Sequence, residues 1–296
     1  MKTLNLTSPE TSDIKFEVSH FPDGQQDVKI ASSKVELGHY DGEHYWIATP
    51  IILKSRFNSF EDLELILCAT KALKRAGGGE IHLYIPYLLG ARSDRKFTDG
   101  GTSYLVDIVA PILNAQNFKS VTALDAHSDV AAACINNLRV IDNEELVAFA
   151  MADLYPCTWD TSKENCVLVS PDGGSLKKIY HAADHLKYRG DILVCSKYRD
   201  QEGALSRIEV PIRDSQIAKD FIIIDDICDG GRTFIEIAKV IKARANFTGN
   251  IYLIVTHGIF SKGFNELADN FQTIYCTNSY SELKPNPNFV KQLNVF

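Results

Sequence analysis

The segment FIIIDDICDGGRTF, residues 221–234, decides how this sequence folds and what it binds. An apolar run typical of a buried parallel strand leads directly into Asp225 and Asp226. A glycine-containing loop follows, and Thr233 stands where a helix should begin. Loops of this kind direct backbone N–H groups and the positive end of a helix toward a phosphate. The segment therefore predicts a phosphoribosyl site, in which the two carboxylates bind ribose hydroxyls directly or through hydrated Mg²⁺.

A purely structural interpretation of the same segment is available. Asp225 and Asp226 could cap a turn, and the glycines could simply bend it. However, two adjacent carboxylates at the end of a buried strand are costly to desolvate unless they have partners. This cost favours a binding role.

The rest of the chain predicts an α/β fold built from repeated βαβ units. Short apolar runs, each followed by polar or glycine-containing turns, predict buried parallel strands at residues 81–86, 120–126, 166–172, 190–196, 220–226 and 250–258. Amphipathic stretches at residues 60–79 and 233–250 predict crossover helices between strands.

Length and internal similarity predict two domains. A chain of 296 residues exceeds the usual size of one domain, and each half contains a strand that ends in a polar turn, DAHSD in the first and IDDICDGG in the second. We expect a boundary near residues 142–154, which gives domains 1–145 and 146–296. In open α/β sheets ligands bind at the carboxyl ends of strands, so residues there are the candidates for chemistry.

Composition excludes several classes of protein. A net charge of −7 argues against nonspecific nucleic-acid binding, which needs an excess of Lys and Arg. The sequence has neither a signal-peptide pattern nor an apolar run long enough to span a membrane, so we expect a cytoplasmic protein without a membrane partner. The seven cysteines are scattered and never form a CxxC pair, which favours reduced thiols over zinc or disulfides.

Several motifs then indicate a family. Residues 221–234 resemble the phosphoribosyl pyrophosphate loop that type I phosphoribosyltransferases share with ribose-phosphate pyrophosphokinases. Six further segments resemble pyrophosphokinase motifs, in that family's order: FPDGQ (21–25), IPYLLGARSDRK (85–96), SVTALDAHSD (120–129), SPDGGSLKK (170–178), CSKYR (195–199) and THGIFS (256–261). A phosphoribosyltransferase needs only the first loop, so the motif set favours a divergent pyrophosphokinase.

The resemblance implies a fold and a reaction. Each domain would be type I phosphoribosyltransferase-like, with a mainly parallel sheet flanked by helices. The enzyme would move the β,γ-diphosphate of ATP to the anomeric hydroxyl of ribose 5-phosphate, with Mg²⁺ as cofactor and AMP as the second product, and would form a homo-oligomer. Such a transfer depends mainly on in-line positioning and on cations that neutralise developing charge.

The resemblance also implies roles for individual residues. The expected catalytic residues are Lys197, Arg199 and His127, and the expected metal-binding residues are His127 and Asp172. The expected ATP-binding residues are Phe21, Asp23, Gln25, Arg92, Ser93 and Asp94. The expected ribose-phosphate-binding residues are Asp225, Asp226, Asp229, Gly230, Gly231, Arg232 and Thr233.

Simpler interpretations exist for some of these residues. His127, taken alone, fits a structural histidine after a strand. Lys197 and Arg199 fit either a charged surface hairpin or a mobile loop that closes over phosphates. Phe21 could belong to a nucleotide site, in part from a neighbouring subunit, but from the residues alone a core aromatic is the simpler interpretation.

The chain departs from the family inside its motifs. The phosphate loop lacks the usual first threonine and carries Arg232 where glycine is usual, and Ser93 and Gln25 replace glutamine and glutamate. A guanidinium suits additional phosphate oxygens, which leaves open a 5′-substituted acceptor such as ADP-ribose, giving ADP-ribose pyrophosphate. A phosphoribosyltransferase and a catalytically silent regulatory relative also remain as alternatives.

Overall fold

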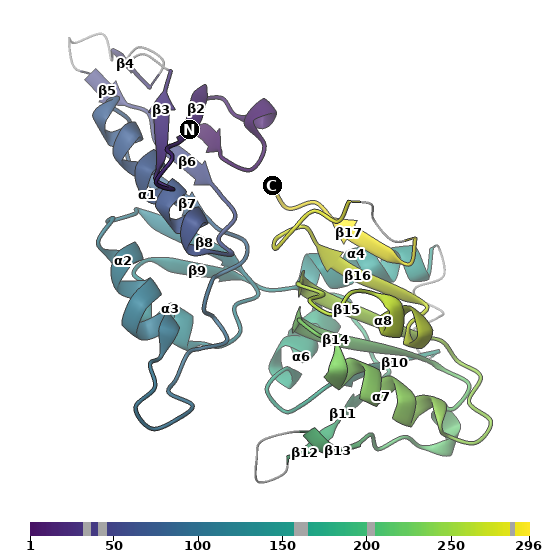
Figure 1. The fold of residues 1–296 in the computed structure, drawn as a ribbon. Coiled ribbons are helices and arrows are strands. Elements are labelled where there is room, and N and C mark those ends of the chain that lie inside the picture. The colour runs from purple at the N-terminus through teal and green to yellow at the C-terminus, as the bar shows by residue number, and fades with distance from the viewer. Residues whose placement is uncertain (32–36, 41–45, 157–164, 200–204, 285–287) are drawn as a thin grey trace. The chain divides into compact units, whose positions relative to one another are not determined.

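The computed structural model describes residues 1–31, 37–40, 46–156, 165–199, 205–284 and 288–296. The chain divides into two compact units (Figure 1): unit 1 is Met1–Ile141 together with Phe296, and unit 2 is Asp142–Val295. The sequence placed this division after residue 145, so the structural division falls slightly earlier in the chain.

Unit 1 is built on a parallel sheet with the strand order β1-β6-β7-β8-β9. These strands are β1 (Lys2–Asn5), β6 (Ile51–Lys54), β7 (Ile81–Tyr84), β8 (Ser120–Leu124) and β9 (Leu138–Ile141). The helical segments are η1 (Pro9–Thr11), α1 (Phe60–Arg75), η2 (Tyr104–Val109), α2 (Ala110–Asn114) and α3 (Val130–Cys134). Two antiparallel hairpins complete the unit, β2 (Phe16–His20) with β3 (Gln26–Ile30) and β4 (Gly38–Tyr40) with β5 (Trp46–Ala48).

Helix α1 shows why the local sequence folds as it does. Ser59 accepts a hydrogen bond from the Asp62 N–H at 3.2 Å, and the Asp62 carboxylate accepts one from the Ser59 N–H at 3.0 Å. This reciprocal capping box satisfies two N–H groups at the start of the helix. The buried face of α1, formed by Leu63, Ile66, Ala69, Thr70 and Leu73, then packs into the core of unit 1.

Unit 2 is built on a second parallel sheet, with the order β11-β10-β14-β15-β16-β17. The strands are β10 (Cys166–Ser170), β11 (Asp191–Val194), β14 (Asp220–Cys228), β15 (Ile251–Gly258), β16 (Thr273–Thr277) and β17 (Val290–Leu293). The helical segments are α4 (Glu144–Leu154), α6 (Leu176–His185), η3 (Asp214–Gln216), α7 (Arg232–Lys242) and α8 (Asn265–Asn270). An antiparallel hairpin of β12 (Ser196–Arg199) and β13 (Leu205–Glu209) follows β11.

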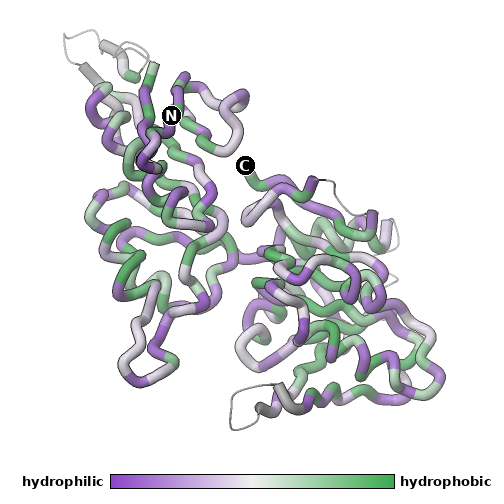
Figure 2. The backbone as a smooth tube through the Cα atoms, viewed as in Figure 1, coloured by the Kyte–Doolittle hydropathy of each residue, from purple (hydrophilic) through white to green (hydrophobic). Residues whose placement is uncertain are grey.

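The central strands of unit 2 are buried on both faces, and their residues alternate between two cores. On β14, Phe221 and Ile223 pack in the cluster that contains α7, whereas Ile222 and Ile224 pack in the cluster that contains α4 and α6. This alternation follows from the two-residue period of a strand. Figure 2 shows the resulting concentration of hydrophobic residues along the strands of this sheet. Both units are therefore parallel α/β structures of the predicted class.

Two further expectations concern cysteines and membranes. The cysteines in the described part of the chain are all free: Cys68, Cys134, Cys166, Cys195, Cys228 and Cys276. Cys157 lies outside the described residues. Among the helices that the structure describes, none is both long and apolar enough to cross a membrane.

Candidate functional site

The candidate site of unit 2 lies at the carboxyl edge of its sheet. Strands β10, β14 and β15 are parallel neighbours, and β11 pairs with β10 in the same direction, so all four end at one edge. The segments that follow them are residues 171–175, the β12–β13 hairpin, residues 229–231 and residues 259–261. The predicted phosphate loop and the predicted lysine–arginine motif lie in these segments.

The loop after β14 requires a glycine at its last position. Gly231 has φ +76° and is the N-cap residue of α7. A Cβ atom there would lie 2.9 Å from Cδ2 of Leu267, so both the backbone conformation and the space exclude a larger residue. Because glycine has no side chain, no side-chain hydrogen bond caps the first turn of α7. The amide end of this eleven-residue helix therefore has the geometry of an anion site.

The loop after β15 braces the phosphate loop. The hydroxyl of Ser261 donates to Oδ1 of Asp229 at 2.6 Å. The N–H groups of Ile259 and Phe260 donate to the carbonyl of Cys228 at 2.9 and 3.1 Å. The sequence motif THGIFS was noticed only as a resemblance, and the role of Ser261 in holding Asp229 was missed.

The two adjacent aspartates at the end of β14 have different surroundings. Oδ1 of Asp225 accepts a hydrogen bond from the Ser175 hydroxyl at 2.6 Å. Asp226 is 4% exposed, and its Oδ2 lies 3.9 Å from Nζ of Lys178 on α6. Burial, and then the charge of Asp226, raises the pKa of the Asp225 carboxyl well above its ordinary value. A bound cation or a hydroxyl donor would favour its ionised form.

Lys197 and Asp172 form an ion pair beside these aspartates. Nζ of Lys197 lies 2.8 Å from Oδ2 of Asp172, and the lysine side chain is only 15% exposed. Oδ1 of Asp172 accepts from the N–H groups of Gly174 and Ser175 at 2.9 and 3.2 Å. Burial alone would raise the pKa of Asp172, but Lys197 and these N–H donors together outweigh it and lower the pKa.

Ser175 links the two acidic groups, and the sequence did not single it out. Its hydroxyl lies 2.6 Å from Asp225 and 3.4 Å from Asp172. The structure thus joins Lys197, Asp172, Ser175 and Asp225 in one network. The serine that ends the SPDGGS turn was the available signal, because a hydroxyl after two glycines at a strand end can reach neighbouring strands.

For the remaining predicted residues of unit 2, the structure gives positions and exposure but few contacts. Arg232 is the first residue of α7 and is exposed, and Thr233 follows it with partial exposure. Gly230 precedes Gly231, and a Cβ atom on it would lie 3.2 Å from Cγ of Lys262. Arg199 ends β12, but its side chain lies outside the described residues.

In unit 1 the predicted residue His127 follows β8, at the carboxyl edge of that sheet. Its side chain is exposed, in the turn that precedes α3. The neighbouring Ser128 donates its hydroxyl to Oδ2 of Asp94 at 2.5 Å, and Oδ1 of Asp94 lies 3.3 Å from Nε of Arg95. Two of the predicted motifs of unit 1, residues 85–96 and residues 120–129, are therefore in direct contact.

Ser93 and Arg92, the other two predicted residues of the segment 85–96, have different surroundings. Ser93 is held in a turn, where its hydroxyl accepts from the Tyr104 N–H at 3.4 Å and its carbonyl accepts from the Leu105 N–H at 3.1 Å. Arg92 is exposed. Its side chain can therefore be reached from solvent.

The FPDGQ motif forms the turn of the β2–β3 hairpin. The Phe21 N–H donates to the Gln25 carbonyl at 2.8 Å, the Gln25 N–H donates to Oδ1 of Asp23 at 3.2 Å, and Gly24 has φ +92°. Phe21 is 48% exposed, so the interpretation as a core aromatic is wrong. An exposed phenyl ring at this hairpin turn is compatible with the resemblance, which implies that Phe21 forms part of the wall of a nucleotide site.

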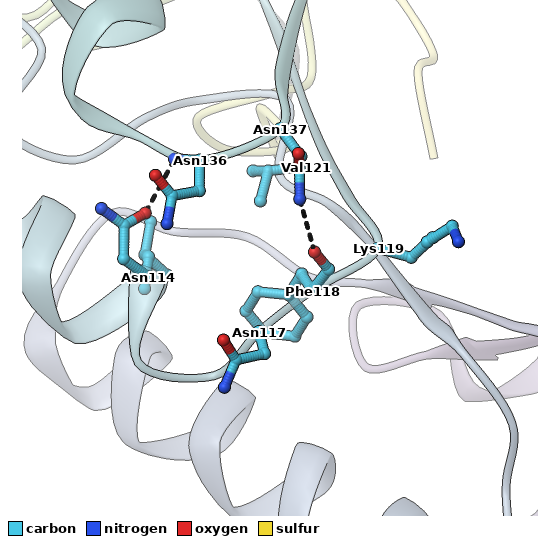
Figure 3. Close-up of a pocket in the computed structure, with 8 residues that line it drawn as sticks. Asn114, Asn117, Phe118, Lys119, Val121, Asn136 and Asn137 are labelled. Carbon is cyan, nitrogen blue, oxygen red and sulfur yellow. Dashed lines mark hydrogen bonds between the residues drawn. The ribbon is translucent and has the colours of Figure 1, made fainter.

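A hollow of about 200 Å³ lies elsewhere in unit 1 (Figure 3). Lys119 directly precedes β8 and Asn137 directly precedes β9, so this hollow is at the amino edge of the sheet, opposite the edge that carries His127. Asn114 accepts from the Asn136 N–H at 2.8 Å, and the Asn137 amide donates to the Phe118 carbonyl at 3.1 Å. These asparagines hold backbone segments together, and the hollow is not the predicted site.

Comparison with known proteins gives a consistent family. No protein-family model matches the chain. The crystal structure of phosphoribosylpyrophosphate synthetase from Mycobacterium smegmatis has the same fold, with a TM-score of 0.76 and 19% identity over 97% of this chain and 88% of that one. Ribose-phosphate pyrophosphokinase of Thermosipho africanus is 28% identical over 267 residues, which cover 90% of this chain and 78% of the relative. That of Staphylococcus epidermidis is 27% identical over 285 residues, which cover 95% and 82%.

The chain has the type I phosphoribosyltransferase-like fold. Within that fold class, the chain is a divergent relative of the ribose-phosphate pyrophosphokinases.

Proposed function

We propose that this chain is an ATP-dependent diphosphotransferase that converts ribose 5-phosphate to phosphoribosyl pyrophosphate and releases AMP. The relatives that carry the name ribose-phosphate pyrophosphokinase support this reaction. The observation in the molecule that supports it best is the network of Lys197, Asp172, Ser175 and Asp225, which lies at the same sheet edge as the glycine loop before α7. The network and the start of α7 together offer one sugar phosphate a cation, two carboxylates and a helix end that can bind an anion.

The acceptor would bind to the loop and to the aspartates before it. Backbone N–H groups at the start of α7 would hold the 5-phosphate, with Asp229, Gly230 and Gly231 forming the turn and Arg232 and Thr233 completing the contact. Asp225 and Asp226 would accept hydrogen bonds from ribose hydroxyls. This arrangement would point the anomeric hydroxyl away from the phosphate loop, toward the incoming diphosphate.

The residues at this edge also fit Mg²⁺. The donor atoms are carboxylate oxygens, which are the ligands that this ion prefers. Asp172 at present holds an ammonium group, since Nζ of Lys197 lies 2.8 Å from its Oδ2. That carboxylate therefore already binds a cation in the position proposed for the metal. Asp172 would hold such an ion in unit 2, and the bound ion would neutralise charge on the triphosphate. His127 would be a ligand of the Mg²⁺–ATP complex at the carboxyl edge of unit 1.

Lys197 would act on the phosphates themselves. Lys197 would donate to an oxygen of the transferred diphosphate, as Arg199 would from the end of β12, and Asp172 would then hold Mg²⁺ in place of the ammonium group. The antiparallel β12–β13 hairpin agrees with either a fixed surface hairpin or a closing loop, and we propose closure, which would bring both cations to the transferred phosphates.

The nucleotide would bind to unit 1. Arg92 would stack on adenine and Asp94, braced by Ser128, would read its edge, with Ser93 keeping the segment in its turn. Phe21, Asp23 and Gln25 would form a further wall of the site from the hairpin turn.

We also propose a homo-oligomer, in which the exposed Phe21 can serve a neighbouring subunit. A native mass spectrum showing only monomer would contradict this arrangement.

A direct assay tests the reaction. The purified full chain is incubated with ATP, MgCl₂ and ribose 5-phosphate, and the products are resolved by mass. We expect AMP and phosphoribosyl pyrophosphate in equal amounts, and neither product when Mg²⁺ is chelated. A phosphoribosyltransferase would instead consume phosphoribosyl pyrophosphate and release pyrophosphate, and a silent regulatory protein would form no AMP; either result would contradict the proposal.

One observation favours a second acceptor. Arg232 is exposed at the first position of α7, where the family usually has glycine, and the usual threonine of the loop is absent. A guanidinium at this position suits a second phosphate group attached to the 5′ position, as in ADP-ribose. The same assay with ADP-ribose, for the wild type and the R232G variant, separates the two. Turnover of ribose 5-phosphate alone would exclude the larger acceptor.

A further inference from the structure

A cluster of histidines and carboxylates joins α4 and α6 of unit 2. Glu144 is the first residue of α4 and Asp142 lies two residues before it, and His181 and His185 are four residues apart on α6, so they share one face of that helix. One ligand atom each from Asp142, Glu144 and His181 lie within 4.8 Å of one another. Nδ1 of His181 is 3.4 Å from Oδ2 of Asp142, and Nδ1 of His185 is 3.5 Å from Oε2 of Glu144.

The His181–Asp142 contact is a long hydrogen bond, and the separations in this cluster also fit ligands of a metal ion. Two ligand atoms bound tetrahedrally at about 2.0–2.2 Å from one ion are about 3.3–3.6 Å apart, which includes both separations. Direct N–H···O hydrogen bonds are usually shorter, at about 2.7–3.2 Å. All four side chains are between 37 and 49% exposed, so an ion can reach them from solvent.

From this geometry we propose that Asp142, Glu144 and His181 bind one divalent transition-metal ion of the zinc type, with His185 beside them in contact with Glu144. Imidazole nitrogen combined with carboxylate oxygen selects such ions over Mg²⁺, which prefers oxygen ligands alone. His181 of α6, Glu144 at the first position of α4 and Asp142 just before that helix supply three protein ligands.

This site is separate from the proposed catalytic site. Ser175 immediately precedes α6, and His181 and His185 lie about 9 and 15 Å farther along the helix axis at about 1.5 Å per residue. The ion would tie the first residues of unit 2 to α6, because Asp142 is the residue at which this unit begins. The expected effect is therefore a more stable unit 2 when the metal is bound, without any direct role in diphosphate transfer.

The competing explanation is that these groups form only exposed ion pairs. Such pairs contribute little to stability and would leave no metal affinity beyond that of scattered surface histidines. The matched control is His20, which is also exposed but lies on β2 in unit 1.

Calorimetric titration of the metal-free full chain with ZnCl₂ tests the proposal. We expect one equivalent to bind to the wild type and to the H20Q variant with equal affinity. In H181Q the affinity should fall by more than about 100-fold, because even second-shell substitutions at metal sites reduce affinity by about 10–100-fold. Equal affinity in the wild type and H181Q would overturn the proposal, as would loss of binding in H20Q.

Two further measurements keep the result interpretable. Circular dichroism of metal-free H181Q should match the metal-free wild type, and added Zn²⁺ should raise the melting temperature of the wild type but not of H181Q. If H181Q is misfolded, the E144Q variant serves in its place and should show the same loss. The Co²⁺ form should show a visible spectrum of nitrogen and oxygen ligands, whereas a thiolate charge-transfer band would place the ion on a cysteine and overturn the assignment.

Discussion

The carboxyl edges of the two parallel sheets differ in how they would bind anions. In unit 2, β14 carries two adjacent acidic residues near its end and leads into a glycine loop before an eleven-residue helix, and Lys197 is held beside Asp172. In unit 1, β8 is followed by the exposed His127 and then by a helix of five residues, α3. Two parallel sheets of different strand order therefore support two kinds of site, one built on backbone amides and buried carboxylates and one built on exposed side chains.

The largest effect should come from the cation of unit 2. The K197A variant should reduce AMP formation on the order of 10²–10³-fold, because it removes the charged donor that we propose acts on the transferred phosphates. The K239A variant is the control, since Lys239 is an exposed lysine of α7 paired with Glu236, and its loss should change the rate by about twofold at most. Undiminished nucleotide cleavage in K197A would remove the catalytic assignment of unit 2.

The next effect tests whether the phosphate loop depends on its backbone. In G231A a methyl group meets Leu267 and the residue must keep φ +76°, so we expect a loss of about 1–3 kcal/mol of unfolding free energy and a higher KM for ribose 5-phosphate. G173A is the matched change, because a Cβ atom there has no neighbour within 4 Å. Urea unfolding and steady-state kinetics on both variants distinguish strain in the loop from a general glycine effect.

The two acidic groups of unit 2 should respond to pH in opposite directions. The pKa of Asp225 is raised in the folded state, first by burial, so its contribution to stability is full below the unfolded value of about 3.9 and is lost as pH rises through the folded pKa. The pKa of Asp172 is lowered, so its contribution is present above that unfolded value and is lost as pH falls.

Asparagine substitutions make this contrast measurable. At pH 8 the D225N variant should melt about 2–4 °C above the wild type, equivalent to about 1 kcal/mol, yet turn over poorly. The D172N variant should melt below the wild type at the same pH. The difference in melting temperature between each variant and the wild type is measured at pH 5 and at pH 8. If this difference changes in the same direction for both variants, the electrostatic distinction between the two carboxylates is wrong.

Much of unit 2 could be predicted from the sequence, because its signals are local. The isoleucine run of β14 and the glycines before α7 are next to each other in the chain, and the strand extends only two residues beyond the predicted end at Asp226. The fold class followed from the same local patterns. The pairing of Lys197 with Asp172 was not predictable, since 25 residues separate them and only the parallel crossover brings them together.

The surroundings of individual side chains could not be predicted from the sequence either. The residues alone favoured a core position for Phe21, because an aromatic side chain usually gains most by burial, whereas the hairpin turn exposes it. Ser175 was missed because a serine becomes significant only when two acidic neighbours from different strands come within reach. The cluster of Asp142, Glu144, His181 and His185 depends in the same way on how α4 packs against α6.

The smallest effects should separate the two edges by substrate. The Ser261 hydroxyl braces Asp229 in unit 2, and the Ser128 hydroxyl braces Asp94 in unit 1. Loss of one such hydrogen bond should cost about 0.5–1.5 kcal/mol, or about 2- to 12-fold in KM. The S261A variant should raise the KM for ribose 5-phosphate and leave that for ATP unchanged, and the S128A variant should do the reverse. If both serines changed the KM of the same substrate, the division of the two substrates between the two units would have to be given up, even if diphosphate transfer itself were intact.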